Sequence, residues 1–240
     1  MCWIIVYNKN SSDLTSYLAS SFENNKVDMV IMGTKSAGGL LNELFGSNTS
    51  NVIQKTNVPI IAVPEKHISR EIKKITYATA FYSTDIKAIK RIVELAKLFR
   101  AQVNVLHVIP EDKNYAQEKE LMRNFMDEVN RKVNYYNLSF QLLGGKSISD
   151  CLENYLKSND TNIMVMSTQQ RNFFERLFQK SMTRKKNTSI VSISTSNRPR
   201  KLTSSHSSSV ILKNNSFIKG RSISNKTNVL ELGLKYVKGV

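Results

Sequence analysis

Long apolar runs and cysteines are both scarce in this 240-residue sequence. No run approaches the ~20 apolar residues that a membrane-spanning helix needs. The N-terminal stretch MCWIIVYNK begins with six apolar residues, which is too short a run for a signal peptide. The two cysteines, Cys2 and Cys151, show neither metal-ligand nor redox spacing. We therefore expect a cytoplasmic protein with no membrane contact and with reduced thiols.

Side-chain patterns typical of catalytic sites are missing as well. The sequence has no Ser-His-Asp order, no metal-ligand spacing and no signature of an activated cysteine. His107 lies in the apolar run VLHV, with no second histidine or paired carboxylate near it in sequence. We interpret His107 as a core histidine rather than a ligand or base. The prediction is a protein that is not an enzyme and holds no metal.

Acidic residues are almost absent from the C-terminal part of the chain. Residues 184–240 contain twelve Lys or Arg and one acid, so they carry +11 of the formal net charge of +16. Residues 195–240 are rich in Ser, Asn and Lys, and we predict a disordered basic tail there. Three interpretations stay open: a nucleic-acid-binding arm, a solvated tail, or the product of a frameshift. Because aromatic residues are not interleaved with the basic ones, a frameshifted tail is favoured over a nucleic-acid arm.

Short apolar runs alternate with amphipathic segments through the middle of the chain. The expected strands are 74–79, 103–108, 138–143, 162–166 and 190–193. The expected helices are 85–99, 114–136 and 148–158. The helical stripes that predict them are Ile86, Ile89, Val93 and Ala96, then Leu121, Phe125, Val129 and Val133. This alternation predicts an α/β domain at 70–194, with a five-stranded parallel sheet flanked by helices.

The N-terminal part of the chain resembles the second domain when positions 134 residues apart are compared. The matching sets are Leu14, Leu18 and Phe22 with Ile148, Leu152 and Leu156; Val30, Ile31 and Met32 with Met164, Val165 and Met166; Ser47 and Thr49 with Ser181 and Thr183. We interpret the chain as a tandem duplication in which residues 1–66 are a partial copy. Two strands and two helices are missing from this copy, so it packs on the second copy, packs on another subunit or is poorly ordered, and packing on a partner is favoured.

The segment GTKSAGGLLNELFGSNT, which begins at Gly33, suits an anion. A glycine directly after a strand lets backbone N–H groups approach a phosphate closely. Gly46 and Ser47 then open a helix, whose free N–H groups favour a negative charge. Ser47 and Thr49 add hydroxyl donors. The candidate binding residues are therefore Gly33, Ser36, Gly46, Ser47 and Thr49.

The stretch VDMVIMGTKSAGGLLNELFGSNTSNVIQKTNVPIIAVP, residues 27–64, resembles the universal stress protein family in its tandem two-domain form. The resemblance implies a Rossmann-like, adenine nucleotide α-hydrolase-like fold that places the triphosphate of ATP at the Gly33–Ser47 loop. Three features depart from the family pattern. Ser36 replaces the second glycine of the motif, and the first copy lacks the strand that carries a nucleotide-binding Asp. In the second copy, Ala80 takes the position of that Asp. In the second copy Ser167, Gln170 and Lys180 stand where the first has Gly33, Ser36 and Gly46. We expect ATP binding to be weak or lost.

The family resemblance also implies how this chain associates with others. Family members pair through the last strand of each domain, so residues 59–63 and 190–193 are candidate pairing edges for self-association or for another universal stress protein domain. The expected function is a stress-response module that acts by protein association. The alternative is a nucleic-acid-associated protein that binds phosphates through the basic tail.

Overall fold

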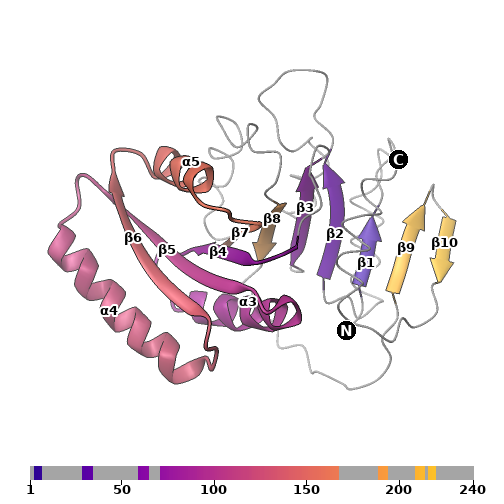
Figure 1. The fold of residues 1–240 in the computed structure, drawn as a ribbon, viewed down its shortest axis with the longest axis horizontal. Coiled ribbons are helices and arrows are strands. Elements are labelled where there is room, and N and C mark those ends of the chain that lie inside the picture. Colours follow the sequence, from indigo (N-terminus) through magenta and orange to yellow (C-terminus); the bar gives the residue numbers. More distant parts are fainter. Residues whose placement is uncertain are drawn as a thin grey trace.

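A computed structural model describes residues 3–6, 29–34, 59–64, 71–167, 189–193, 209–213 and 216–219 of the chain (Figure 1). The described helices are α3 (Asp85–Phe99), α4 (Tyr115–Lys132) and α5 (Ile148–Ser158). The strands are β1 (Trp3–Val6), β2 (Met29–Thr34), β3 (Ile60–Pro64), β4 (Lys74–Ala78), β5 (Gln102–Pro110), β6 (Leu138–Gly145), β7 (Ile163–Ser167), β8 (Ser189–Ile193), β9 (Ser209–Lys213) and β10 (Ser216–Lys219).

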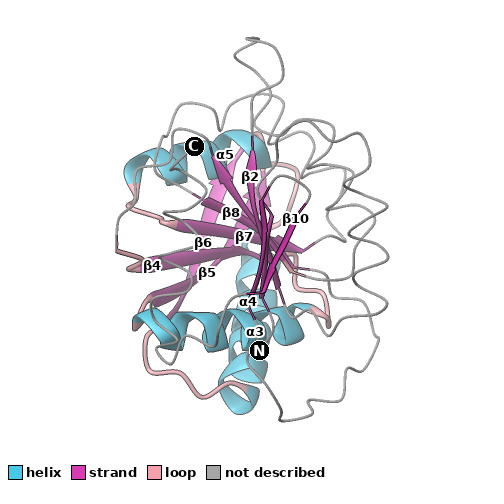
Figure 2. Cartoon of the chain, turned by 90° about the vertical axis from the view of Figure 1, so that its right-hand side faces the viewer, coloured by secondary structure: helices cyan, strands magenta, loops and turns pink. Residues whose placement is uncertain are grey.

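All of these strands belong to one ten-stranded sheet with the order β10-β9-β1-β2-β3-β8-β7-β4-β5-β6. Within the half formed by β4 to β8, every neighbouring pair is parallel. Helices α3 and α4 cover one face of this half and α5 covers the other, which Figure 2 shows from the side. The predicted α/β class, a parallel sheet flanked by helices, is confirmed.

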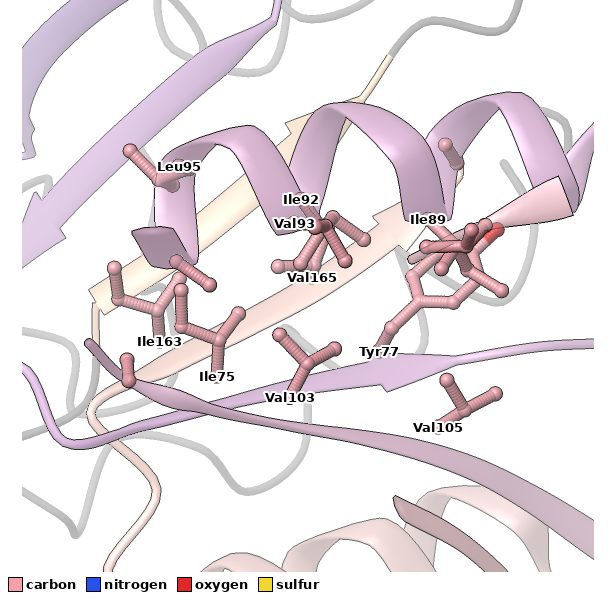
Figure 3. Packing of buried hydrophobic residues seen from close by; sticks show 14 of the residues in the cluster. Ile75, Tyr77, Ile89, Ile92, Val93, Leu95, Val103, Val105, Ile163 and Val165 are labelled. Atoms are coloured by element: carbon pink, nitrogen blue, oxygen red, sulfur yellow. The ribbon is translucent and has the colours of Figure 1, made fainter. Parts of the chain in front are cut away.

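Helix α3 shows why the periodicity of this sequence predicts its structure well. Its bounds coincide with the expected range, and Asp85 at its start suits the positive end of the helix dipole. All four residues of the expected stripe are buried. They pack against the side chains that β4, β5 and β7 direct to the same face (Figure 3). Alternation along β4 sends Ile75 and Tyr77 to this face.

Helix α4 departs from its predicted stripe at one position. Leu121 is 43% exposed, while Met122 is buried together with Phe125 and Val129. A spacing of four drifts around a helix of 3.6 residues per turn, whereas Met122 lies about three full turns before Val133. The helix begins at Tyr115 because the side chain of Asn114 accepts hydrogen bonds from N–H groups of the first turn. Glu111 and Asp112 therefore lie before the helix.

The opposite face of the sheet packs on α5 and contains polar pairs. The Tyr155 hydroxyl lies 2.7 Å from Asn104 Nδ2, which donates to it. The hydroxyls of Thr76 and Thr161 lie 3.0 Å apart in the buried layer. Each polar group therefore keeps a partner, which offsets the cost of its burial.

The two halves of the sheet meet where β3 pairs with β8 in antiparallel orientation, with Ile61 opposite Val191. On either side of this junction the strands are parallel, with Val30 paired with Ile60 and Met164 paired with Ile190. The core also crosses this junction, since Ile31 belongs to the hydrophobic cluster under α3. Both expected pairing edges thus have hydrogen-bonded neighbours on both sides, within one chain.

Strand β1 pairs directly with β2, in the slot that β4 fills beside β7. The outer edge of β1 then accepts β9, and β10 follows as an antiparallel neighbour. Both of these strands come from the segment 195–240, for which the sequence predicts disorder, so the structure differs from that prediction at residues 209–213 and 216–219. The physical reason is the open edge of β1, whose backbone groups need partners. None of the described helices is both long and apolar enough to cross a membrane.

Candidate functional site

The chain reverses its direction across the sheet between β4 and β7. From β4 it proceeds outward to β5 and β6, and after α5 it returns to β7 on the other side of β4. In open α/β sheets, ligands bind beyond the carboxyl ends of the strands at such a reversal. The segment at this position is the loop 79–84 between β4 and α3, together with Ser167 at the end of β7.

A buried carboxylate organises this loop from within. Asp85 is fully buried, and its Oδ2 atom accepts a hydrogen bond of 2.6 Å from the Thr79 hydroxyl. The same oxygen accepts the backbone N–H groups of Ala80 and Tyr82, each at 3.2 Å. These N–H groups face the carboxylate of the protein itself and are not available to an anionic ligand.

Aromatic packing closes the loop on its other side. Phe81 has a φ of 61°, a left-handed conformation that costs a non-glycine residue ~1 kcal/mol. Its ring stacks on His107 with ring centroids 4.1 Å apart and lies 5.3 Å from the ring of Phe125. Its N–H donates to the Thr79 hydroxyl at 3.0 Å. The contacts that this unusual backbone conformation permits therefore hold the aromatic ring against β5 and α4.

His107 links the loop to helix α4. Its Nδ1 atom lies 2.9 Å from the carbonyl oxygen of Thr79, which fixes the proton on that nitrogen because a carbonyl only accepts. Its Nε2 atom lies 3.2 Å from Oε2 of Glu118, without the direction that a hydrogen bond requires. His107 is thus a mostly buried residue with a neighbour at each nitrogen, and α4 supplies the carboxylate that is distant in sequence.

Tyr77 lies beneath the loop with its hydroxyl in the protein interior. Neither this hydroxyl nor Oδ1 of Asp85 has a hydrogen-bond partner in the part of the chain that the structure describes. Burial raises the pKa of the Tyr77 hydroxyl well above its usual value of 10, and the negative charge of Asp85 raises it further. Ionisation of this phenol would place a second negative charge beside a buried carboxylate.

This raised pKa makes stability depend on pH above pH 10. The unfolded chain releases the Tyr77 proton near pH 10 while the folded protein retains it, so stability is complete below pH 10 and falls as the pH rises. One such group lowers the free energy of unfolding by at most about 1.4 kcal/mol per pH unit. Urea unfolding of Tyr77→Phe at increasing alkaline pH should show a correspondingly shallower loss than the unsubstituted protein.

The matched control for this measurement is Tyr136→Phe, because the Tyr136 side chain is 83% exposed. That variant should lose stability with pH as steeply as the unsubstituted protein does. Equal slopes for Tyr77→Phe and Tyr136→Phe would show that the Tyr77 phenol titrates normally.

Of the binding residues predicted from the sequence, one lies in the described part of the chain. Gly33 is near the carboxyl end of β2 and pairs with Val63. Ser36, Gly46, Ser47 and Thr49 lie outside the described residues, as do Gln170 and Lys180. In the second half, Ala80 contributes only its N–H to the loop and Ser167 is fully buried.

Sequence reasoning missed the residues that hold the loop together. In the sequence, Asp85 has the pattern of an ordinary acidic residue in the first turn of a helix. In the structure its carboxylate points back to the preceding loop and accepts the N–H of Tyr82. Glu118 reads as an amphipathic-helix acid, and only the packing of α4 brings it to His107. Among the described residues no group of three or more His, Cys, Asp or Glu side chains could hold a metal ion.

Comparisons with known proteins point to one family. The model of the universal stress protein family matches residues 22–64. A functionally unknown protein from Pseudomonas aeruginosa PAO1 is similar in structure, with a TM-score of 0.58 at 14% identity over 78% of this chain and 69% of that one. A putative universal stress protein from Pseudomonas aeruginosa UCBPP-PA14 gives a TM-score of 0.56 at 13% identity, with the same coverage of 78% and 69%.

A universal stress protein from Archaeoglobus fulgidus DSM 4304 gives a TM-score of 0.51 at 12% identity, over 75% of this chain and 64% of that one. At these identities the likeness concerns the fold. No curated protein matches the chain in sequence. The resemblance of residues 27–64 to the universal stress protein family is confirmed, and the tandem two-domain form stays a prediction.

Proposed function

We propose that this chain acts as a stress-response module through protein association. Its residues 22–64 match the model of the universal stress protein family, and the fold of the chain is similar to that of a solved universal stress protein. In this proposal the protein is cytoplasmic and non-enzymatic, and its nucleotide binding is weak or lost.

The observation that carries the loss of nucleotide binding is the set of hydrogen bonds to Asp85. A nucleotide held at the end of β4 would need free polar groups in the loop 79–84, and the N–H groups of Ala80 and Tyr82 are bonded to the carboxylate. Ala80 also lacks the carboxylate expected at this position of the family. The second half of the chain therefore offers a filled loop in place of a nucleotide cradle.

The first half of the chain keeps the strand-end glycine of the phosphate loop, Gly33, where the second half has Ser167. Gly33 stands near the carboxyl end of β2, as a phosphate loop requires. Beside β2, however, stands the short strand β1. We infer that, within the described part of the chain, an anion bound by the Gly33–Ser47 loop meets no wall shaped for adenine and ribose.

Calorimetry of the full chain tests this proposal with two ligands, magnesium-ATP and magnesium-tripolyphosphate. We expect dissociation constants above about 10 μM for both, within about threefold of each other, because only phosphate contacts remain. Gly33→Asp should abolish the heat of both, since it adds a side chain and a negative charge to the loop. A sub-micromolar affinity for ATP, or a strong preference for ATP over tripolyphosphate, would contradict the proposal.

The alternative function is nucleic-acid binding, and the charge of the C-terminal part supports it. Residues 184–240 carry +11, and such a segment attracts phosphates with an affinity that falls steeply with salt. Deleting residues 195–240 discriminates between the two functions. Tight binding of nucleic acid at physiological salt that disappears with this deletion would favour the alternative.

A further inference from the structure

Strand β6 ends the sheet, and among the described strands only β5 pairs with it. The N–H of Val103 on β5 donates to the carbonyl of Asn137 at 2.9 Å, so Asn137 is a residue whose backbone faces β5. Alternate residues in a strand direct their backbone groups to opposite edges. Leu138, Phe140 and Leu142 therefore direct their N–H and C=O groups away from β5, toward the open edge.

The composition of β6 lacks the usual protection of an edge strand. Natural proteins shield such edges with charged residues, proline, bulges or very short strands. The β6 sequence LSFQLLGG has eight residues and contains no charge and no proline. Helices α4 and α5 each pack on β5 as well as on β6, so each covers a face of the sheet beside this edge. Gln141 and Gly144 of β6 are exposed and its other residues are partly buried, whereas β4 and β7 are almost completely buried.

The pattern of β6 is also complementary to itself. In an antiparallel pair centred on Phe140, Leu138 of one copy faces Leu142 of the other, and the two Phe140 residues face each other. On the opposite face Ser139 meets Gln141 of the other copy. The outward backbone groups of these three apolar residues then pair with their equivalents. An uncharged strand brings no like charges together in such a pair.

We propose that the β6 edge binds the β6 edge of a second copy of this chain and extends the sheet across a two-fold axis. The junction within the chain already has this antiparallel geometry, with β3 beside β8. Both of those strands have neighbours on each side, so they leave no edge for a second copy. The strands of the basic C-terminal segment, β9 and β10, lie at the far end of the sheet from β6, which keeps their charges apart in the dimer.

This inference rests on the association part of the proposed function, for which it names the surface and the partner. It is independent of the nucleotide part. Tight ATP binding in calorimetry would overturn the nucleotide part of the proposed function. It would not change whether the chain is a monomer or a dimer.

Sedimentation equilibrium of the full chain at about 100 μM tests the proposal, because a dimer with a dissociation constant of about 10 μM is the main species at this concentration. We expect twice the monomer mass of 27.3 kDa. Leu142→Pro removes one outward N–H while leaving the bonds to β5 intact, so this variant should be monomeric with an unchanged circular dichroism spectrum. Leu142→Val keeps the N–H and an apolar side chain, and it should dimerise as the unsubstituted chain does.

Cross-linking gives an independent readout of the register. In a Cys2→Ser, Cys151→Ser background, Phe140→Cys should form a disulfide-linked dimer, because directly opposed residues lie ~5.5 Å apart between Cα atoms. Leu138→Cys should not, because its own equivalent lies roughly 13 Å away along the strand. A monomeric unsubstituted chain, a dimeric Leu142→Pro, a monomeric Leu142→Val or equal cross-linking at both positions would overturn the proposal.

Discussion

Replacing Asp85 by alanine is expected to lower the free energy of unfolding by about 3 kcal/mol. The carboxylate is fully buried and accepts hydrogen bonds from the Thr79 hydroxyl and from the N–H groups of Ala80 and Tyr82. Alanine leaves these donors without their acceptor in a site with little room for water. Each lost bond to a charged acceptor costs ~1.5–3 kcal/mol, and relief of the buried charge offsets part of the sum.

Urea unfolding measures this effect, and two variants control for it. Asp85→Asn keeps one oxygen acceptor of similar size, so it should lose about half as much stability. Asp127→Ala removes an exposed acid of α4 and should change stability by less than about 0.5 kcal/mol. An Asp85→Ala variant as stable as Asp127→Ala would show that the carboxylate does not organise the loop.

Replacing Ile89 by alanine is expected to lower the free energy of unfolding by about 3–4 kcal/mol. Ile89 is fully buried and projects from the centre of α3 toward Tyr77 and the neighbouring strands (Figure 3). Truncation removes three carbons from a layer in which the surrounding side chains belong to rigid strands. The cavity can collapse only partly, which puts the cost in the upper part of the usual range.

The neighbouring position on α3 supplies the control for this substitution. Lys90 is exposed, so Lys90→Ala should leave stability within about 0.5 kcal/mol of the unsubstituted protein. Urea midpoints with unchanged slopes would report the difference directly. If Ile89→Ala cost no more than Lys90→Ala, helix α3 would not pack as the structure has it.

The sequence predicts the second half of the chain well because local patterns determine most of it. The apolar spacing of Ile86, Ile89, Val93 and Ala96 defines α3, and a stripe of this kind reports directly on the face of a helix. Leu121 misled the same reasoning in α4, because a spacing of four looks regular in sequence but drifts around the helix.

Features that depend on distant parts of the chain could not be predicted in the same way. The contact of His107 with Glu118 requires the position of α4, and the pairing of β9 with β1 requires an edge that local patterns do not reveal. For the candidate site, the glycine motif identifies Gly33 at the end of a strand. The role of Asp85 was missed, because the turn that brings its carboxylate back to Tyr82 depends on the left-handed conformation of Phe81.

The antiparallel junction of β3 and β8 has a mechanical consequence. A hinge between the halves would have to break the ladder in which Ile60, Ile61 and Ala62 pair with Ser192, Val191 and Ile190. The hydrophobic cluster under α3 runs across the same line through Ile31 and Ile61. Separating the halves along this line would therefore cost the ladder and the packing of the shared cluster together, so the two halves are expected to move as one sheet.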